Sequence, residues 1–384
     1  MATQTANFRI DPRSRLLGAG AHAIEVLLHG LEQGHSILTR QGAPIRTKAD
    51  TRQRLFVQTS GSSGAPKMIR RSPESWIRSF DLAADLFGVT SADTYAILGD
   101  IGHSLSLFAT MEALHIGADL ACLSGLRPRS QLSGLTQHGV TTLYATPTQL
   151  RMLLSVSNGP ILPDLKRLFV GGGSLDPALR NALSSAIPSA DLREFFGASE
   201  TSFITMADPT TPEGSVGKAY PGVTLRVAAP FETAEIWVRS PYLFDGYEQG
   251  ETPDTQWDRD FLSVGELGYL DDAGNLFLRG RKSRMVTVAD QNVFPDEVER
   301  VLLQQDTVLH AAVLALPDTQ RGHVLVAMIQ PNADLSKATL REACKKALGA
   351  ASVPRRFILL ARMPLLPAGK PDLQALQAQL RGMV

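Results

Sequence analysis

The alternation of apolar and polar positions divides the chain into segments with helical and extended patterns. Apolar residues recur at helical spacing over 21–32 and 73–87. Between residues 95 and 186, short apolar runs that favour strands alternate with further helical patterns. The expected strands are 95–98, 118–123, 142–145 and 167–170, and the expected helices are 105–114, 149–155 and 177–186. This alternation predicts an α/β fold with a largely parallel sheet and a ligand site at the carboxyl ends of its strands.

The pattern changes near residue 216, where closely spaced strands and turns replace the alternation. Strands are expected at 225–227, 235–238, 268–270 and 276–278, and the last two flank a hairpin turn at 272–275. A different pattern follows residue 285, with helices at 295–304 and 337–348, strands at 311–316, 324–329 and 357–360, and a final helix. We therefore predict two domains. Residues 1–281 form a large domain with mostly parallel sheets and a small β-rich subdomain, and residues 285–384 form an α+β domain.

Composition narrows the class of protein. The chain of 384 residues is 43% hydrophobic and 20% charged, as soluble globular proteins are. Its 38 basic residues equal its 38 acidic residues, so no overall field attracts nucleic acid or an anionic membrane. Cys122 and Cys344 match no metal or disulfide spacing, and no apolar run has the length of a signal peptide or membrane span. We expect a cytoplasmic protein with no nucleic-acid or membrane partner.

The segment 59–67, with the sequence TSGSSGAPK, carries the clearest chemistry. It follows an apolar, strand-like run and combines small hydroxyl residues, glycines and one cation. Backbone N–H groups, hydroxyls and a lysine that converge on a small volume suit a polyphosphate. A flexible linker is the alternative interpretation, but the compact ending in Pro-Lys favours phosphate binding. The residues concerned are Thr59, Ser60, Gly61, Ser62, Ser63, Gly64 and Lys67.

Four further segments could also carry chemistry, although each one alone could equally be a tight turn or a solvated charge. They are 171–174, 195–201, 265–268 together with 280–281, and 366–370. Glu200 stands beside hydroxyls in a glycine turn and could hold Mg²⁺ together with a phosphate oxygen. Glu266 could accept both hydroxyls of a ribose, and Arg281 could reach a phosphate. Lys370 is presented on a loop rich in proline and glycine.

The order and spacing of these segments resemble those of the adenylate-forming superfamily, which contains acyl- and aryl-CoA synthetases, nonribosomal-peptide adenylation domains and luciferases. The resemblance runs from about residue 54 to the end of the chain. The matching motifs are 59–67, 196–200, 264–266, 280–281, 292–299 and 364–370. Because six motifs occur in the family's order, the resemblance is specific. It implies ATP and Mg²⁺ as cofactors and a mobile C-terminal domain that carries the catalytic lysine.

The resemblance also implies roles for individual residues. The loop 59–67 would hold the β- and γ-phosphates of ATP, Ser199 would contact the α-phosphate, and Glu200 would bind Mg²⁺. Lys370 would bridge the carboxylate and α-phosphate oxygens as they react. His103 would gate the acyl pocket, or else be a histidine that only begins a helix. The other residues expected at the nucleotide are Gly172, Gly173, Phe196, Gly197, Glu266 and Arg281.

Several positions depart from the family pattern. Fewer than sixty residues precede the phosphate segment, so we expect one N-terminal subdomain of the family to be missing or shortened. Glu266 is one methylene longer than the usual aspartate. Arg284 stands at the expected hinge. Ala289-Asp290 replaces a glycine pair that many members place against the pantetheine arm, and this bears on the second half-reaction.

The predicted reaction joins a carboxylic acid to ATP, releases pyrophosphate, and transfers the acyl group from the adenylate to a thiol of CoA or of an acyl carrier protein. We expect a small aromatic acid, because Phe195, Gly171-Gly172 and Leu105 would line a flat apolar slot. Short members of the family resemble the aryl-acid ligases of secondary metabolism. The alternative hypothesis is a nucleotide-binding protein that has lost ligase activity.

Overall fold

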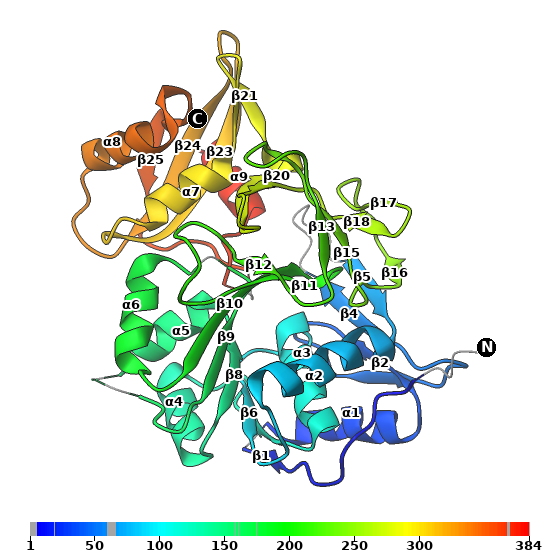
Figure 1. Ribbon diagram of the computed structural model, residues 1–384. Helices are drawn as coiled ribbons and strands as arrows, with labels where there is room; N and C mark the ends of the chain where they lie inside the picture. The colour runs from blue at the N-terminus through cyan, green and yellow to red at the C-terminus, as the bar shows by residue number, and fades with distance from the viewer. Residues whose placement is uncertain are drawn as a thin grey trace.

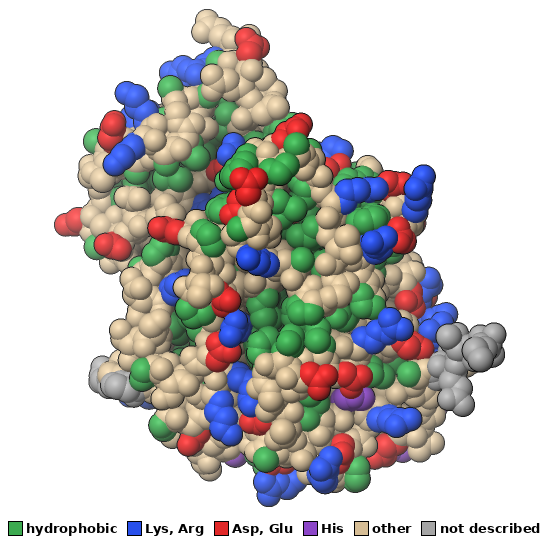
Figure 2. Space-filling model, in the orientation of Figure 1, with side chains coloured by type: hydrophobic (Ala, Val, Ile, Leu, Met, Phe, Trp, Pro, Cys, Tyr) green, Lys and Arg blue, Asp and Glu red, His purple; other side chains and the backbone are tan. Residues whose placement is uncertain are grey.

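The computed structural model describes residues 6–18, 20–59, 67–157, 159, 161–173, 175–366 and 369–383. Figure 1 shows a larger body, blue to green, beneath a smaller yellow, orange and red body that holds the C-terminus. We call residues 6–281 the N-terminal part and residues 285–383 the C-terminal part. Basic and acidic side chains are interspersed over the face in Figure 2. No helix in the described ranges is long and apolar enough to cross a membrane.

A central sheet of eight strands organises the N-terminal part. Its order is β1-β7-β6-β8-β9-β10-β11-β12, with parallel neighbours from β1 to β10 and antiparallel neighbours beyond. The strands are β1 (Leu16–Leu17), β6 (Thr94–Ile97), β7 (Asp119–Cys122), β8 (Thr142–Ala145), β9 (Arg167–Val170), β10 (Asp191–Ala198), β11 (Ser202–Ala207) and β12 (Lys218–Ala219). The predicted α/β class with a largely parallel sheet is confirmed.

The described residues of the N-terminal part form six helices. They are α1 (His22–Glu32), α2 (Pro73–Phe87), α3 (Ser104–Ile116), α4 (Pro128–Gln137), α5 (Pro147–Leu154) and α6 (Pro177–Ala186). Of these, α3 packs on this sheet and α1 packs on β2 (Ser36–Thr39) and β3 (Arg46–Lys48) of a second sheet. The predicted bounds of α2 and α6 are confirmed to the residue. The apolar pattern does not predict α4, because only Leu132 and Leu135 supply an apolar face in a helix that is otherwise polar.

A second, five-stranded sheet lies on the other side of α3, which packs on β6, β7 and β8 and also touches β4 (Figure 1). Its order is β16-β5-β4-β2-β3. The strands are β2 (Ser36–Thr39), β3 (Arg46–Lys48), β4 (Leu55–Thr59), β5 (Lys67–Arg71) and β16 (Gly246–Gln249). In the antiparallel pair of β4 and β5, Thr59 lies directly opposite Lys67.

Two small antiparallel sheets form the β-rich region. One has the order β13-β15-β18-β17 and the other β14-β19-β20. The strands are β13 (Thr224–Arg226), β14 (Ala234–Glu235), β15 (Trp237–Arg239), β17 (Gln256–Asp258), β18 (Phe261–Ser263), β19 (Glu266–Leu270) and β20 (Leu276–Arg281). The single strand expected at 235–238 is wrong: the chain changes sheet at the buried Ile236, so β14 pairs with β19 whereas β15 pairs with β13 and β18.

The C-terminal part is an antiparallel sheet, β22-β21-β24-β23, to which β25 adds in parallel alongside β24. Its elements are a 3₁₀ turn (Lys282–Arg284), β21 (Val286–Val288), β22 (Gln291–Val293), α7 (Pro295–Leu303), β23 (Val308–Asp318), β24 (Gly322–Pro331), α8 (Lys337–Leu348), a second 3₁₀ turn (Ala350–Ser352), β25 (Arg356–Leu359) and α9 (Leu373–Arg381). Within the described residues, each cluster of buried apolar side chains lies wholly on one side of residues 281–285.

Hydrogen bonds and ion pairs tie the short connection, residues 282–284, to both parts. Lys282 donates its backbone N–H to Gly265 O at 2.8 Å, and its Nζ donates to Glu235 Oε2 at 3.0 Å. Arg284 instead contacts the C-terminal part, at 2.7 Å from Asp296 Oδ1 and 2.6 Å from Glu299 Oε1. The residue expected at the hinge is therefore fixed to one part, and Ser283 separates the two anchored residues.

Helix α3 carries a carboxyl group that is buried in the core of the N-terminal part. Glu112 is fully buried, and its Oε2 accepts a hydrogen bond from the Tyr95 hydroxyl at 3.0 Å. Its Oε1 has no hydrogen-bond partner among the described residues. Burial raises the pKa of Glu112 to about 8, so the side chain holds a proton at neutral pH.

Replacing Glu112 should therefore change how stability depends on pH. A carboxyl whose pKa rises from 4.5 to about 8 on folding contributes stability at low pH, and loses it as the pH rises through that window. Glu112→Gln cannot titrate and keeps an acceptor for Tyr95. We expect its free energy of unfolding to rise relative to wild type by up to roughly 1.4 kcal/mol per pH unit between about pH 5 and 8. Urea unfolding at several pH values measures this, with the exposed Glu342→Gln as control. A difference that does not vary with pH would contradict a protonated Glu112.

Candidate active site

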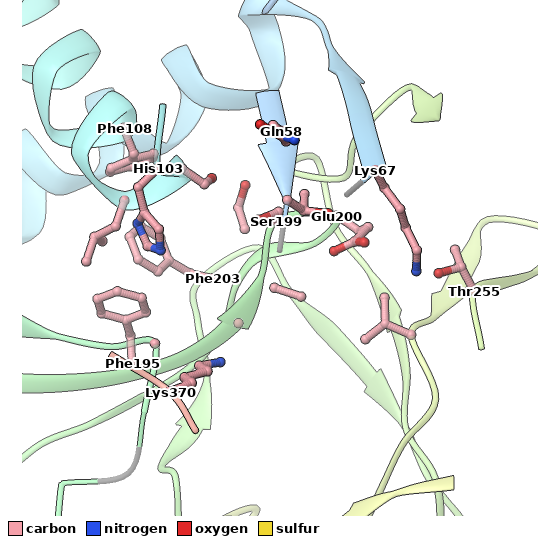
Figure 3. A pocket seen from close by; sticks show the side chains of 18 of the residues that line it. Gln58, Lys67, His103, Phe108, Phe195, Ser199, Glu200, Phe203, Thr255 and Lys370 are labelled. Atoms are coloured by element: carbon pink, nitrogen blue, oxygen red, sulfur yellow. The ribbon is translucent and has the colours of Figure 1, made fainter. Parts of the chain in front are cut away.

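One cavity of about 220 Å³ lies where the carboxyl end of β10, the ends of β4 and β5, the start of α3 and the loop of residue 370 meet. In Figure 3, His103, Phe108, Phe195 and Phe203 gather on one side of it, and Lys67, Glu200 and Thr255 on the other. The predicted site residues that line the cavity are Thr59, Lys67, His103, Gly172, Gly197, Ser199, Glu200, Arg281 and Lys370. The fold thus brings together residues from both ends of the chain.

Ser60, Gly61, Ser62, Ser63 and Gly64 fall outside the described residues, although Thr59 and Lys67, which flank them, both line the cavity.

Three predicted residues do not line the cavity. Phe196 packs against the apolar cluster that contains Ile204 and Leu276. Gly173 lies beside Pro147 at the start of α5. Glu266 pairs with Arg281, whose Nε donates to Glu266 Oε1 at 3.0 Å, so Glu266 adjoins the cavity through that arginine.

Glu200 is held in the turn between β10 and β11. Gly197 permits this turn, because a Cβ there would lie 2.0 Å from Ser202 O. Glu200 Oε1 accepts a hydrogen bond from the Tyr247 hydroxyl at 2.8 Å, and the same hydroxyl is 2.8 Å from Thr255 Oγ1. Burial and the neighbouring Glu200 raise the pKa of Tyr247, so it stays a neutral donor. Glu200 makes no other side-chain hydrogen bond within the described part of the chain, which leaves Oε2 free for a ligand.

Tyr247 and Thr255 were not found from the sequence, since they lie some fifty residues from Glu200 and belong to no motif. Tyr247 also contacts Lys67, whose Nζ lies 5.8 Å from the centre of its ring. The tyrosine therefore connects the carboxylate at one edge of the cavity to the cation at the start of β5.

Arg71, also missed from the sequence, is fully buried behind the Glu200 turn. Its Nη2 donates to Ser199 O at 2.5 Å, and its Nη1 donates to Tyr242 O at 2.7 Å and to Ser75 Oγ at 3.1 Å. Desolvation lowers the pKa of Arg71 to about 10, against the raising influence of Asp245 and Glu200. The guanidinium stays charged at neutral pH and fixes the backbone that carries Ser199 and Glu200.

The aromatic side of the cavity is built by ring contacts. Phe195 and Phe203 meet edge to face at 4.7 Å between ring centres, Phe108 and Phe203 at 5.1 Å, and Trp76 and Phe108 at 5.2 Å. The ring of Phe195 covers Gly171, where a Cβ would lie 2.2 Å from Phe195 Cζ. Gly171 therefore supports the aromatic wall and does not itself line the cavity.

His103 lies directly before α3, at the edge of this wall. Burial, and secondarily the charge of Lys370, lower the pKa of His103, so its ring is neutral at pH 7. A neutral imidazole can offer one donor and one acceptor to a ligand.

Lys370 enters the cavity on a closed loop. Leu366 N–H donates to Lys370 O at 2.7 Å, Gly369 N–H to Leu366 O at 2.8 Å, and Asp372 N–H to Pro364 O at 2.9 Å. Figure 3 shows the amine of Lys370 directed toward the middle of the cavity. Desolvation, and then the charge of Arg281, lower the pKa of Lys370. The nearby carboxylates of Glu266 and Asp296 act in the opposite direction on this pKa. A buried ammonium beside Arg281 is suited to an anionic ligand.

Comparison with known proteins agrees with this geometry. The model of the AMP-binding enzyme family matches residues 32–248, and that of the AMP-binding enzyme C-terminal domain matches residues 297–370. An uncharacterised acyl–CoA ligase of Bacillus subtilis is 31% identical over 322 residues, which are 81% of this chain and 65% of that protein. The 2-succinylbenzoate–CoA ligase of the same species is 27% identical over 322 residues, 80% of this chain and 65% of that protein. The chain thus spans about two thirds of the length of these relatives.

Solved structures show the same fold. The o-succinylbenzoate CoA synthetase of Bacillus subtilis, in complex with an acyl-adenylate, has a TM-score of 0.74 at 25% identity, over 84% of this chain and 68% of that one. An amide bond synthetase from Marinactinospora thermotolerans has a TM-score of 0.75 at 24% identity, over 88% and 72%, and this likeness concerns the fold alone. Because the AMP-binding enzyme model matches more than half of the chain, the chain belongs to the AMP-binding enzyme family.

Proposed function

We propose that this protein activates a carboxylic acid with ATP to an acyl-adenylate, releases pyrophosphate, and then transfers the acyl group to a thiol. The observation that carries the proposal is the convergence of Lys67, Glu200 and Lys370 on one cavity that also has an aromatic wall. Cations and a carboxylate suit a nucleotide phosphate with a metal ion, whereas the aromatic wall suits the organic part of an acid. The relatives named as acyl–CoA ligases support the same reaction.

The residues present fit ATP and Mg²⁺. No group of three or more acidic, histidine or cysteine side chains in the described ranges could hold a metal by itself. A single free carboxylate such as Glu200, completed by nucleotide phosphates, is how proteins often hold Mg²⁺. Bound there, Mg²⁺ would offset phosphate charge. The Bacillus subtilis CoA synthetase has also been solved with ATP and magnesium ion.

In this proposal the chain's own groups divide the work. Thr59 and Lys67 bind the β- and γ-phosphates, and Ser199 contacts the α-phosphate. Lys370 lies between the acid's carboxylate and the α-phosphate, where its charge offsets the repulsion between two anions as they approach. Arg281, with Glu266 beside it, holds the ribose side of the nucleotide.

For the acid we propose a small aromatic carboxylate. The cavity of about 220 Å³ and its walls of Phe108, Phe195 and Phe203 suit a flat ring. Gln58 and Leu105 also line the cavity. A relative named for 2-succinylbenzoate, an aromatic acid, supports this class.

The proposed thiol is that of CoA, since the relatives are named as CoA ligases, with an acyl carrier protein as the other possible acceptor. Ala289 and Asp290, between β21 and β22, have left-handed backbones with φ of 48° and 61°. The turn thus keeps a conformation that favours glycine, although it carries two side chains.

The proposed reaction has two successive steps, formation of the adenylate and transfer to the thiol. To serve both steps, we propose that residues 285–384 act as a separate, mobile domain. Ser283, between the anchored Lys282 and Arg284, would then be the pivot.

ATP–pyrophosphate exchange with benzoates, anthranilates and fatty acids tests the proposal, and we expect exchange with at least one small aromatic acid. In Lys370→Ala, exchange should fall by several orders of magnitude while nucleotide binding measured by calorimetry stays nearly unchanged, because a contact made in the transition state is lost. The exposed Lys346→Ala, in α8, serves as a matched control and should retain exchange. Nucleotide binding without exchange on any acid would instead favour a binding protein without ligase activity.

Tyr247→Phe tests the proposed metal ligand. The variant keeps the ring beside Lys67 but removes the hydrogen bond that orients Glu200, and loss of such a supporting bond weakens metal affinity by roughly tenfold or more. We expect the Mg²⁺ concentration for half-maximal exchange to rise by about that factor. Thr255→Val, which removes the hydroxyl that contacts the Tyr247 hydroxyl, should cause a smaller rise. An unchanged Mg²⁺ requirement in Tyr247→Phe would count against Glu200 as the ligand.

A further inference from the structure

We propose that Thr148, at the start of α5, is a positioning residue that seats the Lys370 loop in the cavity. Its Oγ1 donates a hydrogen bond to Gly369 O at 3.3 Å, across the boundary between the N- and C-terminal parts. The kinetic consequence rests on the proposed function, whereas the contact itself can be tested without it.

Thr148 is held in place by the way α5 begins. Thr146 and Gln149 form a reciprocal cap: Gln149 N–H donates to Thr146 Oγ1 at 3.3 Å, and Thr146 N–H donates to Gln149 Oε1 at 2.9 Å. Pro147 occupies the first turn, and Leu150 is buried on the inner face. The hydroxyl of Thr148 therefore projects from a fixed turn, and Thr146 beside it lines the cavity.

Gly369 fits against Thr148 only because it lacks a side chain. A Cβ at this position would lie 2.7 Å from Thr148 Oγ1 and 2.8 Å from its Cγ2. The backbone of Gly369 also has φ of +81°, a left-handed conformation that side chains disfavour. Close approach to α5 and a turn into Lys370 thus both require glycine here.

The backbone around Gly369 connects this contact to the lysine. Gly369 is bonded directly to Lys370 and its N–H donates to Leu366 O, while Leu366 N–H donates to Lys370 O. The carbonyl that Thr148 holds and the backbone of Lys370 therefore cannot move independently over a large distance. The Thr148 hydroxyl thereby restricts the position from which the Lys370 side chain extends into the cavity.

Thr148→Val removes the hydroxyl and keeps the shape. We expect its kcat for ATP–pyrophosphate exchange to fall about three- to tenfold, the loss of one neutral hydrogen bond, with little change in KM for ATP or acid. Thr148→Ser should restore most of the rate. Thr136→Val, in the distant α4, is the matched control and should equal wild type. An unchanged kcat in Thr148→Val would overturn the proposal.

A double-variant cycle separates positioning from a general structural role. If Thr148 acts through Lys370, then adding Thr148→Val to Lys370→Ala should change the residual rate less than twofold. An equal loss in both backgrounds would show that Thr148 supports the fold rather than the lysine, and would overturn the proposal.

Hydrogen–deuterium exchange tests, independently of any reaction, whether Thr148 holds the Lys370 loop in place. In Thr148→Val the amides of Leu366 and Gly369 should exchange several-fold faster than in wild type, because the loop loses its anchor, while α5 itself should be unchanged. Unaltered protection of this loop would overturn the proposal. If wild type exchanged no pyrophosphate with any acid, the proposed function would fail, but this measurement would still decide whether Thr148 holds the loop.

Discussion

The buried guanidinium of Arg71 is the constraint on which the arrangement of the site depends. A fully buried charge costs several kcal/mol unless hydrogen bonds satisfy it, and no carboxylate within the described residues contacts Arg71 directly. Its Nη1 and Nη2 donate instead to the carbonyls of Ser199 and Tyr242 and to Ser75 Oγ, whereas Nε has no partner among the described residues. Because Arg71 ends β5 and Ser199 precedes β11, these bonds join the second sheet to the central sheet. The end of the phosphate segment and the Glu200 turn are thereby held at a fixed separation.

The cavity that this junction creates has two unlike sides. Aromatic rings stacked edge to face occupy the side nearer to α3, and they bury their area without polar groups that need partners. On the other side, Glu200, Tyr247 and Lys67 form a connected polar group, and Lys370 enters between the two sides. His103, with its lowered pKa, is neutral near Lys370, so the acyl side adds no second cation to the lysine. This division suits the two ligands that we propose for the cavity, an aromatic acid and a charged nucleotide.

Local pattern was a good guide wherever one face of an element is apolar. The bounds of α2 and α6 follow from helical spacing with a proline at the first position, and the parallel strands β8 and β9 follow from short apolar runs. The pattern failed at α4, which is largely polar, and at Ile236, where a single apolar run serves two sheets. Local pattern also does not show that Arg284, expected at the hinge, is paired with Asp296 and Glu299 of the C-terminal part. Periodicity reports which side of an element is buried but not which neighbour buries it.

By itself the sequence determined the family motifs and the identities of Lys67, Glu200 and Lys370, because each stands in a short contiguous segment with a recognisable composition. Only the tertiary structure decided that these residues share one cavity, that Glu266 adjoins it through Arg281, and that Phe196 turns into a separate core. It also supplied Arg71, Tyr247 and Thr148. Their contacts with Ser199, Glu200 and Gly369 span 128, 47 and 221 residues of the chain, respectively. Such contacts form between segments that are distant in the sequence and adjacent only after folding, so no local pattern encodes them.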